Sequence, residues 1–200
     1  IAICRELNSQ GAKYLDRVRV NLEPSIAPTL AAWRQSPDGR LTDGTTGPGM
    51  SDFLDMFWQA TVPDELFYAC SDPRLDDATW DLATAKGENP CKAVLAAIPS
   101  IAPAALLLSG LGPHRADLLP GWLGMFALTN QQVDAASEGI RKAHALAPQR
   151  RFDALQRMHD LTDAAGVATY PIAALLDALP SVLGSALADG TGLIGVSAVM

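Results

Sequence analysis

The chain has 200 residues, of which 48% are hydrophobic and 18% charged, so it is not intrinsically disordered and is long enough to bury a sizeable core. Its formal net charge of −7 argues against binding to nucleic acid or to anionic membranes, because both carry negative charge. We therefore expect no nucleic-acid partner and no membrane partner. A protein partner, in particular a basic one, would suit this charge.

Residues 1–35 show the spacing of an N-terminal helical pair. Apolar residues recur every three or four positions over residues 1–20, where Gly11 interrupts the pattern. A second short helix is expected from Ser25 to Gln35, with Pro28 in its first turn. The two helices alone would leave an apolar face uncovered, so we expect them to pack on the main body.

The stretch from 36 to 50 is rich in Gly, Pro, Asp and Thr, which is typical of turns. It is either a surface loop or a linker. The sequence thus divides into the helical pair at 1–35, this loop or linker at 36–50, and a main helical domain at 51–200.

A cluster of carboxylates surrounds one tryptophan near the middle of the chain, in the stretch "DPRLDDATWD". Carboxylates at the start of a helix complement its dipole, so the cluster has a purely structural explanation. An exposed tryptophan among acids would also form a contact surface for a basic partner. The candidate binding residues are Asp72, Asp76, Asp77, Trp80 and Asp81.

Residues 93–112 contain no charge over twenty positions, the length that crosses a bilayer. Pro99 and Pro103 interrupt this stretch, which favours a pair of buried helices over a membrane segment. Three scattered cysteines, none in a metal-ligand or C-x-x-C spacing, indicate reduced thiols and a cytoplasmic location.

The strongest helical patterns follow Thr129, which forms a capping-box pattern with Gln132. Glu138 and Lys142 stand one helical turn apart, as in a supporting ion pair. Pro148 then begins another helix, whose apolar stripe is expected to comprise Phe152, Leu155, Met158 and Leu161.

The last helical pattern, residues 171–190, has an apolar face with Asp177 as its one interior charge and should be largely buried, and Pro180 is expected to kink or divide it. Strand patterns appear at residues 122–128 and 192–199, which could pair. The expected fold is therefore mainly α, a compact multi-helix domain with at most a small two-stranded sheet.

Gly190, Gly192 and Gly195 reproduce the G-x-G-x-x-G spacing of dinucleotide-binding loops. That motif needs a strand before the glycines and a helix after them, whereas here a helix precedes them. We therefore predict a helix C-cap, with Gly190 or Gly192 at positive φ, leading into a buried terminal strand.

The histidines offer one catalytic candidate, because His159 has Asp163 one helical turn later. A carboxylate at this spacing can orient an imidazole for general-base chemistry, although a helix-edge ion pair is the plainer interpretation. The sequence contains no recognised metal-ligand, phosphate-loop or nucleophile-elbow spacing. We accordingly expect no metal and no cofactor.

Two functions remain open. The first is a non-catalytic acidic helical interaction protein, such as an inhibitor, an immunity-type protein or an adaptor. The second is an enzyme or carrier that binds a small apolar molecule between helices. The aromatic and apolar residues that would line its site are Phe53, Phe57, Trp58, Trp122, Met125 and Phe126.

Overall fold

Seven helices and one two-stranded sheet make up the part of the chain that the structure, a computed structural model, describes: residues 2–36, 39–41, 49–60, 101–167 and 170–195. The helices are α1 (Ala2–Gln35), α2 (Met50–Ala60), α5 (Pro103–Leu111), α6 (Pro113–Ala116), α7 (Asn130–His144), α8 (Pro148–Ala164) and α9 (Ile172–Asp189). The strands are β1 (Phe126–Leu128) and β2 (Leu193–Gly195). The mainly-α expectation is confirmed.

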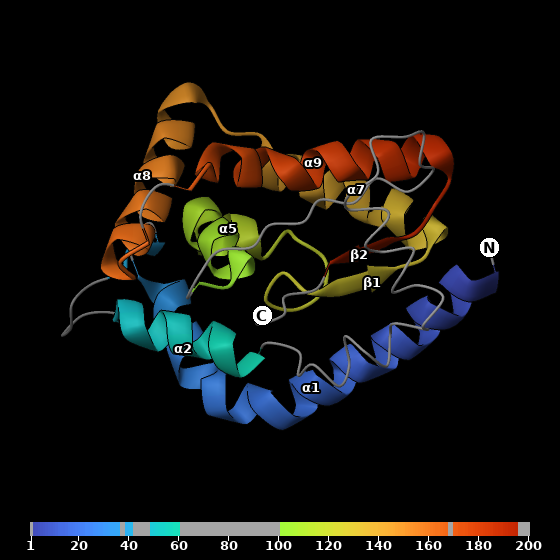
Figure 1. Ribbon diagram of the computed structural model, residues 1–200, viewed down its shortest axis with the longest axis horizontal. Coiled ribbons are helices and arrows are strands. Elements are labelled where there is room, and N and C mark those ends of the chain that lie inside the picture. Colours follow the sequence, from blue (N-terminus) through green and yellow to red (C-terminus); the bar gives the residue numbers. More distant parts are fainter. Residues whose placement is uncertain (1, 37–38, 42–48, 61–100, 168–169, 196–200) are drawn as a thin grey trace.

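The N-terminal pair of helices is in fact one helix, α1, which runs through the Gly11 position without a break. Pro24 and Pro28 lie inside it, so Pro28 does not begin a helix as we expected. Each proline removes a backbone hydrogen bond and crowds the preceding turn, which bends a helix rather than ending it when packing holds both sides. Figure 1 shows α1 changing direction along its length.

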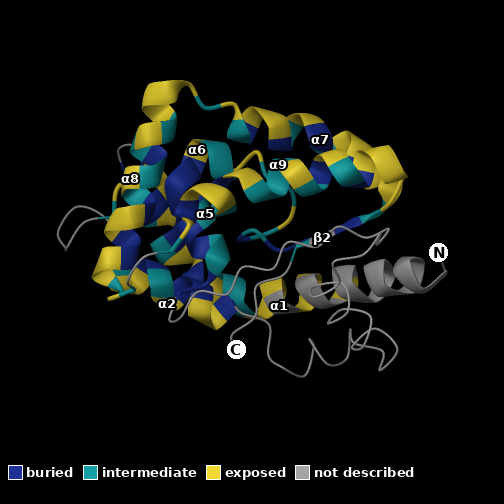
Figure 2. Cartoon of the chain, turned by 45° about the horizontal axis from the view of Figure 1, so that its top comes forward, coloured by how far each residue is buried: buried dark blue, intermediate teal, exposed yellow. Residues whose placement is uncertain are grey.

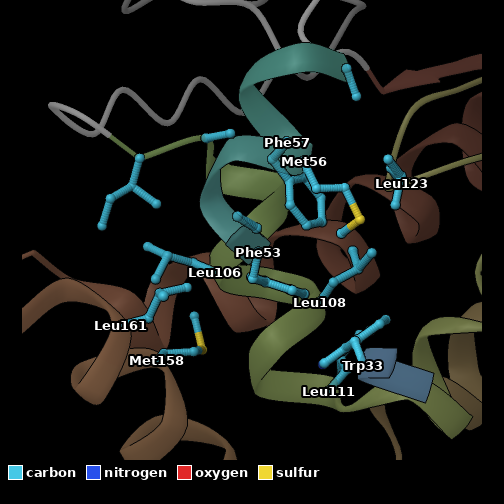
Figure 3. Packing of buried hydrophobic residues seen from close by; sticks show 14 of the residues in the cluster. Trp33, Phe53, Met56, Phe57, Leu106, Leu108, Leu111, Leu123, Met158 and Leu161 are labelled. Atoms are coloured by element: carbon cyan, nitrogen blue, oxygen red, sulfur yellow. The ribbon is translucent and has the colours of Figure 1, made fainter. Parts of the chain in front are cut away.

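The main core surrounds α5, which Figure 1 places between α2, α8 and α9. Helix α5 contains no charged residue and begins with Pro103 in its first turn, so nearly all of it can be buried. Figure 3 shows side chains from α1, α2, α5 and α8 meeting in this core. Its large members include Trp33, Phe53, Met56, Phe57, Leu106, Leu108, Met158 and Leu161.

A second apolar cluster lies between α7, α9 and the sheet, and comprises Phe126, Val133, Ile140, Leu183, Ala186 and Leu193. The strands β1 and β2 are antiparallel, with Phe126 opposite Gly195. The pairing of the two predicted strand segments is therefore confirmed. Gly190 ends α9 in the left-handed conformation, at φ 63°, and Leu193 is buried, as expected.

Local sequence signals explain the boundaries of α7 and α8. Thr129 Oγ1 accepts from the Gln132 backbone N–H, and the Gln132 side chain accepts from the Thr129 N–H, which completes the predicted capping box. Lys142 Nζ lies 3.2 Å from Glu138 Oε1, and Pro148 occupies the first turn of α8. Both expectations are confirmed.

The predicted apolar stripe of α8 was wrong at Phe152, whose side chain is 63% exposed. The buried residues of this helix are Ala154, Met158, Leu161 and Thr162. At 100° per residue, position 152 lies about 200° from position 154, so Phe152 faces away from the core.

Helix α9 was expected to be largely buried, yet only 22% of its residues are. The buried residues, Ile172, Leu176, Leu183 and Ala186, form a narrow stripe, and Figure 2 shows much of the remaining surface exposed. Its exposed charge Asp177 receives two hydrogen bonds from Arg151 of α8, at 2.8 and 2.7 Å. Among the described helices, α9 alone is long and apolar enough to cross a membrane, a test that core helices also pass.

Two helical glycines should respond in opposite ways to substitution by alanine. A Cβ at Gly139 of α7 would lie 2.5 Å from the backbone oxygen of Leu118, whereas a Cβ at Gly184 of α9 would have no atom within 4 Å. We expect Gly139→Ala to lower the free energy of unfolding by about 1–3 kcal/mol through overpacking. Gly184→Ala should raise it by about 0.5–1 kcal/mol, because alanine restricts the unfolded chain.

Urea unfolding followed by circular dichroism measures both changes. The matched glycine at position 184 controls for helix propensity, so equal effects at the two positions would contradict the close approach of Leu118 to α7.

Candidate functional site

The acidic candidates Asp72, Asp76, Asp77, Trp80 and Asp81 all lie outside the described residues, so their role as a binding surface stays a prediction. The catalytic candidates His159 and Asp163 are both exposed on α8. Among the described contacts, no hydrogen bond or ion pair joins them, and the backbone oxygen of His159 instead accepts from Thr162 Oγ1 at 2.8 Å. The catalytic role of His159 and Asp163 therefore stays a prediction.

Most aromatic residues proposed to line an apolar ligand site pack as core instead. The ring of Phe53 lies 5.3 Å from that of Trp33 and 5.0 Å from that of Phe57, in tilted arrangements that stabilise aromatic pairs. Met125 and Phe126 are buried, and Trp58 is 39% exposed at the surface. Of that set, Trp122 alone lines a pocket found among the described residues.

The pocket beside Trp122 has a volume of about 130 Å³ and is lined by residues of α1, α5 and the 116–124 segment. The indole Nε1 of Trp122 is buried and has no hydrogen-bond partner within the part of the chain that the structure describes. Leu123 and Gly124 form a tight turn, with φ of 51° and 78°, between the reciprocal backbone hydrogen bonds of Trp122 and Met125. Left-handed backbone at a leucine costs about 1–2 kcal/mol, which its burial at 7% exposure offsets.

A larger cleft of about 640 Å³ lies between the end of α5, α6, the first four turns of α8 and the segment after α1. Its volume is in the usual range for ligand-binding pockets, about 300–1,000 Å³. We call it the arginine cleft, because four arginines line it: Arg40, Arg115, Arg150 and Arg157.

Two of these arginines are held in place by backbone carbonyl groups at helix ends. Arg115 Nη1 donates to the oxygens of Lys142 and Ala143, at 2.7 and 3.0 Å. Arg157 donates from Nε and Nη2 to the oxygens of Ser109 and Gly110, at 3.0 and 2.6 Å. The last carbonyl groups of a helix lack intrahelical partners, so each guanidinium caps one helix while its orientation becomes fixed.

The other two arginines, Arg40 and Arg150, are exposed and make no ion pair or side-chain hydrogen bond with the part of the chain that the structure describes. Arg40 follows Gly39, whose backbone oxygen accepts from the buried Trp33 Nε1 at 3.3 Å. Arg150 stands in the first turn of α8, which Pro148 begins. The buried Trp33 thus positions the backbone beside Arg40, and the start of α8 positions it at Arg150.

The remaining wall of the cleft is mixed in character. Asp153 and Asp160 line it, and each carboxylate accepts from a glutamine of its own helix, Gln149 or Gln156, at 3.0 and 2.9 Å. The exposed ring of Phe152 lies in the same wall. In this arrangement the arginine guanidinium groups can donate paired hydrogen bonds to an anionic group, and the Phe152 ring can pack against an apolar group.

Outside the cleft, the pKa of the partly buried His144 is shifted from its ordinary value. Burial lowers the pKa of His144 below its ordinary value of 6.5, and the nearby charge of Arg115 lowers it further, while a hydrogen bond with the Leu176 backbone and the charge of Asp177 raise it. Nε2 of this ring is buried and has no hydrogen-bond partner among the described residues. The hydrogen bonds from Arg151 lower the pKa of Asp177.

Sequence reasoning missed the arginine cleft because its cations come from positions 40, 115, 150 and 157, which only the fold brings together. Within the described residues, no group of three or more His, Cys, Asp or Glu side chains could hold a metal ion. No family model matches this chain, and neither a curated protein nor a solved structure does so.

We expect the stability of the protein to fall as the pH drops through the His144 titration. The folded pKa of His144 lies below its unfolded value of 6.5, so the unfolded state binds the proton first. The contribution is complete above pH 6.5 and is lost as the pH falls from there toward the folded pKa. Asp177 acts separately, since its stabilising effect is lost only below its ordinary pKa of 3.8.

Urea unfolding at a series of pH values between 8 and 4.5 measures this dependence. Most carboxylates titrate below this range and therefore contribute little to the slope. His144→Gln, which cannot titrate, should flatten the slope near pH 6. An unchanged slope in His144→Gln would show that another group is responsible.

Proposed function

We propose that this chain is a non-catalytic protein-interaction module, as an inhibitor, an immunity-type protein or an adaptor is, and that it binds its partner through the arginine cleft. The observation that carries the proposal is the exposed Phe152 ring among four arginines. Aromatic and arginine side chains are enriched at the centres of protein interfaces.

The energetics of Phe152 support this proposal. Among the exposed large hydrophobic side chains of the described residues, only Phe152 lines the cleft. Complete burial of such a ring contributes about 1.5–3 kcal/mol. A partner that covers the ring would therefore gain apolar burial beside fixed hydrogen-bond donors, the combination that produces a few dominant contacts.

Cross-linking from the cleft tests the proposal. Phe152 is replaced by the photoreactive benzoylphenylalanine, and the protein is irradiated inside the cells that make it. We expect a protein cross-link of one defined mass, identified by mass spectrometry, because the reactive ring would lie in the interface.

The matched control carries the same photoreactive residue at Val20 of α1, which is also exposed but does not line the cleft. The same products from positions 152 and 20, or none from position 152, would overturn the proposal. The proposal also includes a basic partner, contact through the acidic residues at 72–81 and a cytoplasmic location. The identity of the cross-linked protein would test the charge and the location of the partner.

A second candidate function, the binding of a small molecule, is favoured by the pocket beside Trp122. Its volume of about 130 Å³ is close to that of an engineered cavity of about 150 Å³ that holds benzene. Nε1 of Trp122 is covered and has no partner among the described residues, so it would donate to an acceptor on such a molecule once a small side-chain movement exposes it.

Pyridine and benzene form a matched pair of probes, since they share size and differ in one acceptor. Pyridine should raise the melting temperature more than benzene, and Trp122→Phe should remove the difference. Equal shifts from the two compounds in the unmodified protein would exclude this site.

A further inference from the structure

We infer that the arginine cleft recognises an acidic peptide segment of a partner protein, which carries carboxylates for the arginines and an apolar side chain for Phe152. This inference rests on the proposed function and names the chemistry of the partner. It also separates the cleft from the predicted basic-partner surface at residues 72–81, because the two surfaces would bind segments of opposite charge.

The first argument is the local charge. The chain has 22 acidic and 15 basic residues, so carboxylates are in excess. The cleft nevertheless has four arginines against two aspartates in its wall. Arg40 and Arg150 make no ion pair among the described residues. The wall of the cleft therefore carries more positive than negative side chains, which attracts an acidic segment.

The second argument is preorganisation. The backbone oxygens of Lys142 and Ala143 both accept from Arg115 Nη1, so its Nε and Nη2 donors have no partner within the described contacts. Carbonyl groups orient a guanidinium without neutralising its charge. A carboxylate that reaches Arg115 would thus meet donors whose orientation is already fixed, which lowers the entropic cost of binding.

The third argument distinguishes a peptide from a compact polyanion such as a phosphorylated metabolite. Asp153 and Asp160 in the wall would repel a phosphate group that approached the arginines. A peptide can place carboxylates beside the arginines and neutral or basic groups beside the aspartates. The exposed Phe152 ring requires an apolar partner, which a peptide side chain supplies.

Fluorescence anisotropy with synthetic probes tests the inference. The probe is a fluorescein-labelled peptide in which Glu alternates with Leu and Phe, and its charge-reversed counterpart has Lys in place of Glu. We expect the unmodified protein to bind the acidic peptide, with an affinity that falls as salt is added, and to leave the basic peptide free.

The variant Arg40→Gln/Arg150→Gln should lower the affinity for the acidic peptide by about tenfold, because the loss of close charge contacts weakens binding at interfaces. Both side chains are exposed and unpaired in the described structure, so the melting temperature should stay unchanged. The matched control Lys13→Gln/Arg17→Gln removes two exposed charges from α1, away from the cleft, and should keep the affinity.

Equal losses of affinity for the acidic peptide in the two double variants would overturn the inference, because they would show that binding responds to net charge alone. Displacement of the peptide by equimolar pyrophosphate would also overturn it, by identifying a phosphate site. If no peptide binds while cross-linking from position 152 still captures a protein, the inference fails and the proposed function stands. If the acidic peptide binds and cross-linking captures nothing in cells, the proposed function fails instead.

Discussion

The position of the cleft depends on the burial of one side chain, Trp33, which is 1% exposed. Its ring packs on Phe53 and thereby joins α1 to α2, while its indole N–H holds the backbone oxygen of Gly39. Loss of such a ring costs about 3–5 kcal/mol, a large part of the stability of a typical domain, about 5–15 kcal/mol. The same contact that closes the core therefore also places Arg40 at the rim of the cleft.

Arginines connect the helices around this core although the chain is acidic. Arg34 of α1 lies 2.8 Å from Asp117 after α6, and Arg151 joins α8 to α9 through Asp177. Arg115 and Arg157 bridge α6 to the end of α7 and α8 to the end of α5 through carbonyl groups. The exposed ion pairs contribute little each, about 0–1 kcal/mol, whereas the carbonyl contacts also satisfy backbone groups. Two of the four arginines that line the cleft, Arg115 and Arg157, thus also stabilise helix ends.

The sequence predicted the features that depend on near neighbours. The capping box at Thr129, the left-handed C-cap at Gly190 and the first-turn proline of α8 each need only a few consecutive residues. Predictions from the sequence were wrong where packing between distant segments determines the structure. Continuity of α1 through Pro24 depends on partners elsewhere in the chain, and the exposure of α9 depends on how few elements cover it. The arginine cleft could not be predicted, since its cations are spread over more than half of the chain; the run "PQRRFDALQR" in α8 was its one local signal.

The sheet sets an order of events during synthesis. The partner of Phe126 in β1 is Gly195 in β2, so the ribosome must add almost seventy residues before the two strands can pair. At about 5–20 residues per second, this interval lasts roughly 4–14 s. During this interval the side chains of Leu183 and Leu193 are not yet available to cover Phe126, Val133 and Ile140. A nascent chain therefore exposes half of its second apolar cluster for several seconds, and in that period it would be most open to chaperone binding or misassociation.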